Sequence, residues 1–194
     1  MRGATLLEQL LVMLLILVVL SIAIPVMDRQ VQEARARGAA FYMSGRCALL
    51  RMQAVHRDAN VGLRFVPVGT SWRFQTYVDG DWDGVRAADI ATGRDPAIDS
   101  ANQLEAQVPG TMFGFVPGCP LIDGSAVPSG ASPVRIGSAQ MITFTPAGTT
   151  SGGTLYVRGG PHASGYAVVL LAATGRTRLL RCLPGSATWS GDAR

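Results

Sequence analysis

The sequence predicts an α+β protein in which one long N-terminal helix packs on a mostly antiparallel β-sheet head. Residues 6–24 form an almost unbroken apolar run, and an apolar spacing of three to four residues continues to about residue 57. After residue 60 the apolar residues alternate with polar ones, which is the pattern of half-buried strands. We therefore divide the chain into residues 1–3, a first helical segment at 4–26, an amphipathic continuation at 27–58 and a β-rich head at 59–194.

The apolar run is long enough to cross a membrane. Within residues 6–24 only Glu8, Gln9 and Ser21 are polar. At about 1.5 Å per residue the run spans roughly 30 Å, the thickness of one hydrocarbon core. Arg2 favours a cytoplasmic N-terminus by the positive-inside rule, so we expect a single-pass protein with its membrane-spanning helix at 4–26.

Glu8 is the unusual residue of this segment. A carboxylate in a membrane helix costs about 2–3 kcal/mol at mid-bilayer and less near the interface, so it needs a partner. If the chain is cut after Gly3, Ala4 becomes a new amino terminus close to Glu8 in sequence. Glu8 of one subunit can then pair with that amine on a neighbour and set the axial register of an assembly.

The leader resembles a known family. Gly3, Ala4 and Thr5-Leu6-Leu7-Glu8, followed by the long apolar run, resemble the start of type IV prepilins and type II secretion pseudopilins. The resemblance implies that a prepilin peptidase cuts between Gly3 and Ala4 and methylates Ala4, where the family usually has phenylalanine. It also implies an inner-membrane protein with a periplasmic head, which an inner-membrane platform assembles with other pseudopilins or pilins.

Two other interpretations of the N-terminus stay open. The segment is also compatible with an ordinary secretory signal, with Ser21-Ile22-Ala23 as its small-x-small cleavage site, or with a plain membrane anchor. An ordinary signal rarely carries a glutamate at the start of its apolar run, so Glu8 favours the prepilin leader.

The helix is expected to continue beyond the membrane. Pro25 predicts a kink where the apolar run ends, and Asp58-Ala59-Asn60 predicts the helix end. Between them arginines alternate with an apolar face, on which Phe41, Met43 and Leu50 are expected to be core residues.

The head is predicted to be rich in strands. In six segments apolar and polar residues alternate or strand-forming residues are frequent. These segments are 61–65, 72–78, 140–145, 154–158, 165–172 and 176–182. Residues 84–134 are rich in glycine and proline, and there we expect long loops with short strands.

Four motifs of the head resemble the secretion pseudopilin H and minor pilin T family. They are Asp79-Gly80-Asp81-Trp82-Asp83-Gly84-Val85-Arg86 and the segments at 142–148, 153–157 and 174–178. The resemblance implies a minor pseudopilin of a type II protein secretion system, or alternatively a minor type IV pilin that binds DNA for uptake.

An aspartate-rich segment is a candidate calcium loop. Asp79, Asp81 and Asp83 offer carboxylates at alternate positions before Gly84, and Asp89 supplies a later one. An EF-hand would place its closing acid one residue later, however. The alternative is a polar hairpin loop whose aspartates cap their own backbone, and in that case we expect no cofactor.

Three arginines are candidates for DNA binding. Arg176 and Arg178 lie two residues apart, so a strand directs both to one face, while Arg181 falls on the other. Paired arginines can hold phosphates, and the resemblance associates this Gly-Arg-x-Arg pattern with DNA. The alternative is a solvated strand or one that pairs with a neighbouring pilin.

Cysteines and missing motifs limit the chemistry. Of the three cysteines, Cys119 and Cys182 are candidates for a disulfide in an oxidising compartment, and Cys47 is expected to pack as a small apolar residue.

All 17 basic residues counted as Lys or Arg are arginine, which excludes a P-loop lysine. Nucleophile-elbow and zinc-protease motifs are absent from the sequence as well, so we expect no enzymatic activity.

Overall fold

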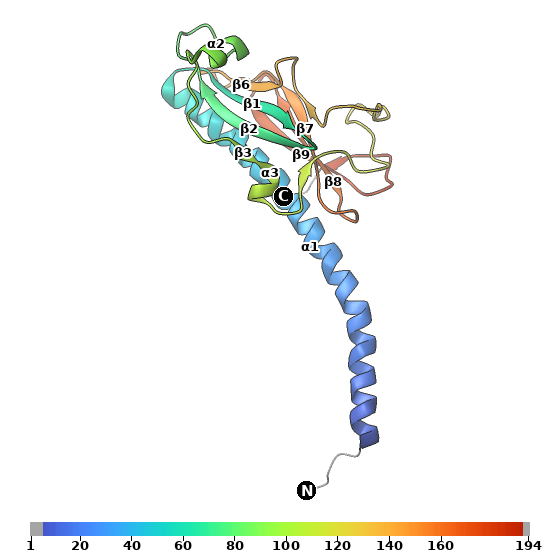
Figure 1. Ribbon diagram of the computed structural model, residues 1–194. Helices are drawn as coiled ribbons and strands as arrows, with labels where there is room; N and C mark the ends of the chain where they lie inside the picture. The colour runs from blue at the N-terminus through green and yellow to red at the C-terminus, as the bar shows by residue number, and fades with distance from the viewer. Residues whose placement is uncertain (1–5, 192–194) are drawn as a thin grey trace.

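One helix dominates the molecule. The computed structural model describes residues 6–191, and its first element, α1 (Leu6–Arg57), is a continuous helix of 52 residues. Pro25 lies inside this helix without ending it, and Figure 1 shows that the first half of α1 is inclined to the half that contacts the head. The expected long helix is confirmed, and it bends without being interrupted.

The helix ends where the sequence predicted. Asp58 takes a left-handed conformation with φ of 51°, and the Ala59 N–H donates to the Ala54 carbonyl at 3.3 Å. Aspartate tolerates this backbone region better than most residues because its short polar side chain can bond locally. The chain can therefore reverse and enter the first strand within three residues of the helix end.

The head contains two antiparallel sheets. The first has the order β3 (Asn102–Gln103), β2 (Ser71–Val78), β1 (Val61–Val68) and β6 (Met141–Phe144). The second has the order β10 (Ser190–Gly191), β9 (Arg176–Cys182), β8 (Gly165–Leu171), β7 (Gly153–Arg158) and β4 (Met112–Phe113), with β5 (Val134–Arg135) also on β7. Two short helices, α2 (Ala87–Thr92) and α3 (Leu104–Gln107), lie in the region expected to be irregular.

The six predicted strands are all present, and the predicted α+β fold with an antiparallel head is confirmed; the strands divide into two sheets. Local hairpins build each sheet: β1 pairs with β2 from Val61 opposite Val78 to Val68 opposite Ser71, and β7, β8 and β9 form a meander. Period-two alternation identifies a strand and its buried face. It does not say which neighbour lies beyond each hairpin, so one sheet could not be distinguished from two.

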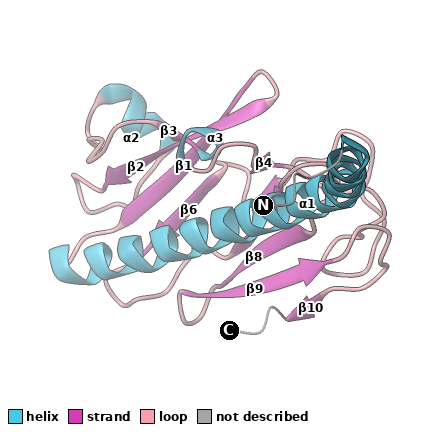
Figure 2. Ribbon diagram, turned by 90° about the horizontal axis from the view of Figure 1, so that it is seen from below, coloured by secondary structure: helices cyan, strands magenta, loops and turns pink. Residues whose placement is uncertain are grey.

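The core forms where α1 covers both sheets. Figure 2 shows the head half of α1 lying across the strands of the two sheets. Small or slender residues of α1 are buried there, which lets the backbones approach closely: Ala36, Ala39, Ala40, Met43, Cys47, Leu50 and Ala54. From the sheets the same core contains Phe65, Phe74, Phe144 and Tyr166.

One predicted core residue lies on the opposite side of the helix. Met43 and Leu50 are fully buried as expected, but Phe41 is 45% exposed. At 100° per residue, positions 41 and 43 are about 200° apart around a helix, so only one can face the sheets. The prediction that Phe41 belongs to the core is wrong because the helix carries two apolar stripes.

The cysteines behave as a pair and a single buried thiol. Cys119 and Cys182 form a disulfide with a Cα–Cα distance of 6.1 Å, which fastens the long loop after β4 to the end of β9. Cys47 is free and buried, and this burial, which outweighs the opposing charge of Arg46, raises the pKa of its thiol to about 12.

Candidate functional site

Between residues 6 and 21, α1 exposes apolar side chains apart from Glu8, Gln9 and Ser21. Every described side chain from Leu6 to Leu20 is exposed, and an 18-residue window of this helix has a mean hydropathy of 3.1 with none of it buried. By length and composition this segment is able to cross a membrane. The predicted processing residues Gly3 and Ala4 lie outside the described residues.

Glu8 lies in the first turn of α1, on the surface of this apolar segment. A carboxylate at a helix N-terminus is favoured by the helix dipole, which reduces the cost of keeping a charge there. The same position leaves the carboxylate within reach of another chain that packs beside the helix.

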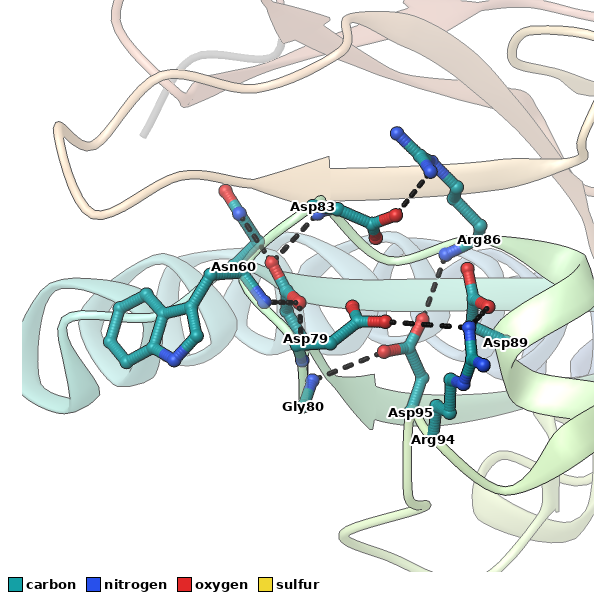
Figure 3. Close-up of polar contacts among 11 residues, drawn as sticks. Asn60, Asp79, Gly80, Asp83, Arg86, Asp89, Arg94 and Asp95 are labelled. Carbon is teal, nitrogen blue, oxygen red and sulfur yellow. Dashed lines mark hydrogen bonds and ion pairs between the residues drawn. The ribbon is translucent and has the colours of Figure 1, made fainter.

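The aspartate loop is organised around Asp79 (Figure 3). Asp79 Oδ1 accepts hydrogen bonds from the backbone N–H groups of Asp81 at 3.2 Å and Trp82 at 2.8 Å. Its Oδ2 accepts from the Gly84 N–H at 2.9 Å and from Asn60 Nδ2 at 2.8 Å. Burial by itself raises the pKa of the Asp79 carboxyl, but these hydrogen bonds outweigh it and hold the pKa below its usual value.

Asp95 completes the loop and was not identified from the sequence. It is almost fully buried, and its carboxylate accepts the Gly80 N–H at 3.1 Å and the Arg86 N–H at 2.9 Å (Figure 3). No local pattern connects Asp95 with the loop it supports, because the two come together only when the chain returns after α2.

The remaining aspartates are paired with arginines. Arg94 Nη1 lies 3.7 Å from Asp89 Oδ1 and 4.0 Å from Asp81 Oδ2, and Asp83 pairs with Arg86. Asp79, Asp81 and Asp83 can bring ligand atoms within 4.8 Å of one another, but Asp89 does not belong to that group. Both oxygens of Asp79 already accept hydrogen bonds, so the geometry favours the capping interpretation, and calcium binding stays a prediction.

The arginines of β9 lie on two different faces. Arg176 and Arg178 are exposed on one face, as their spacing predicted. Arg181 faces α1, and its Nη2 lies 2.8 Å from Glu33 Oε1. Arg181 is therefore separated from the other two and is not available to complete a common phosphate-binding group.

Glu33 joins α1 to the second sheet. Its Oε1 also accepts the Tyr166 hydroxyl at 2.7 Å, and its Oε2 accepts the Ser164 N–H at 2.7 Å. Burial by itself raises the pKa of the Glu33 carboxyl. The hydrogen bonds from Ser164 and Tyr166 and the charge of Arg181 together outweigh burial, so the pKa lies below its usual value. The sequence offered one signal of this role, because Glu33 is the only acid among the arginines of residues 29–57.

Arg46 makes the equivalent connection to the first sheet. It pairs with Asp99, and its Nη2 lies 3.0 Å from Thr76 Oγ1 on β2. Asp99 in turn accepts the Thr76 N–H at 2.8 Å. The helix is thus held to each sheet by a separate charged group.

Few known proteins are similar to this chain. No protein family and no curated protein matches this sequence. Two solved structures of the minor pseudopilin EpsH from the type II secretion system of Vibrio cholerae are similar to the chain. One has a TM-score of 0.45 and 16% identity over 78% of this chain and 99% of that chain. The other has a TM-score of 0.45 and 17% identity over 79% of this chain and 97% of that chain.

Proposed function

We propose that this chain is a minor pseudopilin, a structural and non-enzymatic subunit of a type II protein secretion system. Residues 4–26 hold it in the inner membrane with its head in the periplasm, and after prepilin peptidase cleavage it enters the pseudopilus. The observation that carries the proposal is Glu8, an acid in the first turn of an exposed apolar helix that follows a Gly3-Ala4 junction.

The exposed helix explains why assembly needs a protein partner. Moving one large apolar side chain from an apolar surrounding into water costs about 1.5–3 kcal/mol. A helical segment with this many exposed leucines, isoleucines and valines can leave the bilayer only into another apolar surrounding. Neighbouring helices of the same kind provide that surrounding in the core of a fibre.

Glu8 gives this transfer a defined position. Packing between apolar helices is weakly directional, whereas a carboxylate in an apolar medium requires a specific partner. Cleavage after Gly3 creates an amine on Ala4, and the Ala4 amine of one subunit pairs with Glu8 of the next. The fixed connection of α1 to the head through Glu33 and Arg46 then makes the head follow the helix.

A replacement of Glu8 tests the proposal. We expect Glu8→Ala to leave membrane insertion intact and to abolish crosslinking of the chain to neighbouring subunits, whereas Gln9→Ala retains it. N-terminal sequencing of the mature parent should begin at Ala4. If Glu8→Ala is incorporated as well as the parent, a simple membrane-tethered receptor becomes the better description.

The second candidate is a minor type IV pilin that binds DNA. The observation in its favour is the exposure of Arg176 and Arg178 on the same face of β9. A gel shift at low and moderate salt tests it, with an Arg176→Ala/Arg178→Ala chain compared with an Arg57→Ala/Arg135→Ala chain of equal charge. Equal retention of DNA by the two chains would remove this site.

A further inference from the structure

Arginines surround α1 just beyond the segment that is proposed to cross the membrane. That segment ends at residue 26, and it is followed by Arg29, Arg35 and Arg37, whose side chains are all exposed. We call these three residues the arginine collar. At 100° per residue, Arg29 lies on the same side of the helix as the buried Ala36, beneath the head, and the other two lie on the flanks. The collar therefore presents positive charge in several directions around the helix.

The arginine collar lies at the level of the lipid headgroups. With a rise of about 1.5 Å per residue, the Cα of Arg29 is about 5 Å beyond residue 26 and that of Arg35 about 14 Å. Helical side chains lean toward the helix N-terminus and cover the preceding turn, about 5 Å lower. The headgroup layer of one leaflet is about 5–8 Å thick. Arg29 therefore lies within this layer, Arg35 reaches its surface, and Arg37 lies within a screening length of it.

The head is held close to the same layer. Its loop after β7 lies beside Gln32, whose Oε1 accepts the His162 N–H at 3.4 Å. A side chain on Gly160 would overlap with Gln32, and a Cβ on Gly159 would lie 3.0 Å from that of Ala36, so this contact depends on glycine. Gln32 is about 9 Å beyond residue 26 along the helix. The head, which extends from here away from the N-terminal half of α1 (Figure 1), thus begins at the membrane surface.

Few carboxylates compensate the arginine collar. Within residues 6–191, neither Arg29 nor Arg35 forms an ion pair. The acids in this part of α1 are Asp28 and Glu33, and Glu33 is directed to the head and paired with Arg181. One acid therefore remains against the three arginines of the collar, and an excess of positive charge faces the headgroup layer.

We propose that the arginine collar binds the phosphate groups of anionic phospholipids, so that the head rests on the leaflet from which it emerges. The guanidinium fork matches phosphate oxygens, and each basic residue close to an anionic surface strengthens binding about fivefold. An acidic protein would meet the same charges, but the position next to the hydrocarbon favours lipid. This deepens the proposed function and rests on it for the membrane span: entry into a fibre requires the collar to leave the lipid phosphates.

Lipid enrichment around the full chain tests the proposal. The chain is purified from detergent micelles that contain equal amounts of phosphatidylglycerol and phosphatidylcholine, and the bound phospholipids are extracted and quantified by mass spectrometry. The ratio of phosphatidylglycerol to phosphatidylcholine should exceed that of protein-free micelles about tenfold, because more than one arginine contributes. A ratio equal to that of the protein-free micelles would overturn the proposal.

Two double variants of equal charge locate the lipid contact. Arg29→Gln/Arg35→Gln should reduce the enrichment at least about fivefold. Arg57→Gln/Arg176→Gln, which removes the same charge from the far end of the head, should retain it. All four side chains are exposed, so both chains should have the Tm of the parent. Equal enrichment in the two variants contradicts a contact at the collar.

Two further measurements address other ligands. An excess of glycerol 3-phosphate, which carries the headgroup phosphate without acyl chains, should leave the enrichment unchanged. Displacement of phosphatidylglycerol by this compound would identify a site for soluble phosphate in place of a lipid contact. If Arg29→Gln/Arg35→Gln keeps the lipid ratio of the parent but loses crosslinks to neighbouring subunits, the collar binds an acidic protein, and the proposal is overturned.

The lipid contact and the proposed function can fail separately. None of the lipid measurements requires cleavage, Glu8 or a fibre. Absence of enrichment with Glu8-dependent incorporation intact would reject the lipid contact alone. Enrichment that depends on Arg29 and Arg35, together with unchanged incorporation of Glu8→Ala, would reject the proposed function alone.

Discussion

At the scale of single residues, buried carboxylates organise the segments that lack regular structure. Asp79 and Asp95 each accept two or more main-chain or amide hydrogens, and so they replace the hydrogen bonds that a regular strand would have supplied. Trp82 takes a φ of 67° on this loop, a conformation that a bulky side chain adopts only when its surroundings hold it there. The loop therefore depends on Asp79 more than on any exposed aspartate beside it.

We expect Asp79→Ala to lower the free energy of unfolding by about 1–3 kcal/mol, because it leaves four N–H donors of the loop without their acceptor. Asp83→Ala, at an exposed ion pair, should change it by less than about 0.5 kcal/mol. Urea denaturation followed by tryptophan fluorescence measures both. The same samples test calcium: a Tm that is equal in calcium and in chelator supports capping, and a Tm raised by calcium supports a metal loop.

At the scale of elements, charged side chains of α1 fasten it to both sheets of the head, and Arg51 Nε also donates to the Gly148 carbonyl at 3.0 Å. Glu33 reaches β8 and β9 through Tyr166 and Arg181, and Arg46 reaches β2 through Asp99 and Thr76. Apolar packing alone would allow the helix to slide along its own axis, because its buried side chains are small. The hydrogen-bonded groups accept only one axial position.

A carboxyl with a depressed pKa stabilises the fold above its unfolded pKa, and that contribution is lost as the pH falls through the folded value. The Glu33 pKa lies below its usual value of 4.5. We therefore expect the Tm to be level near neutral pH and to fall below about pH 4.5, with a shallower fall in Glu33→Gln. Thermal denaturation across pH, with Glu105→Gln as the control, measures this, and identical slopes would contradict it.

At the scale of the whole molecule, the chain separates into a projecting apolar helix and a head. Figure 1 shows the first half of α1 projecting away from the head, which lies at the other end of the helix. The disulfide between Cys119 and Cys182 joins residues 63 apart in sequence and secures the longest irregular part of the head. Stability of the head is thus shared between its core and one covalent link.

Reduction of this disulfide should lower the free energy of unfolding by about 2–4 kcal/mol, because the open chain gains conformational freedom when unfolded. Urea denaturation with and without reductant measures the change. Thiol labelling of the unreduced, denatured chain should modify Cys47 alone. Labelling of all three cysteines without reductant would show that the link does not form.

The sequence by itself determined the long helix, its end at Asp58 and the six main strands, because periodicity and turn residues are local properties of the chain. It also determined that Arg176 and Arg178 share a face and that Arg181 does not. For Asp79 it left metal binding and backbone capping open, since both need carboxylates at that spacing. The sequence also left the disulfide undecided, because no local pattern indicates which cysteines meet.

Only the tertiary structure decided which stripe of α1 is buried, that the strands divide into two sheets, and that Asp95 and Glu33 act as partners of distant groups. Each of these depends on contacts between segments far apart in the chain, and their free energy is not encoded in any local pattern. Phe41 and Met43 are both apolar residues of one helix. The shape of the sheets, set elsewhere in the sequence, selects the face with Met43 and leaves Phe41 outside.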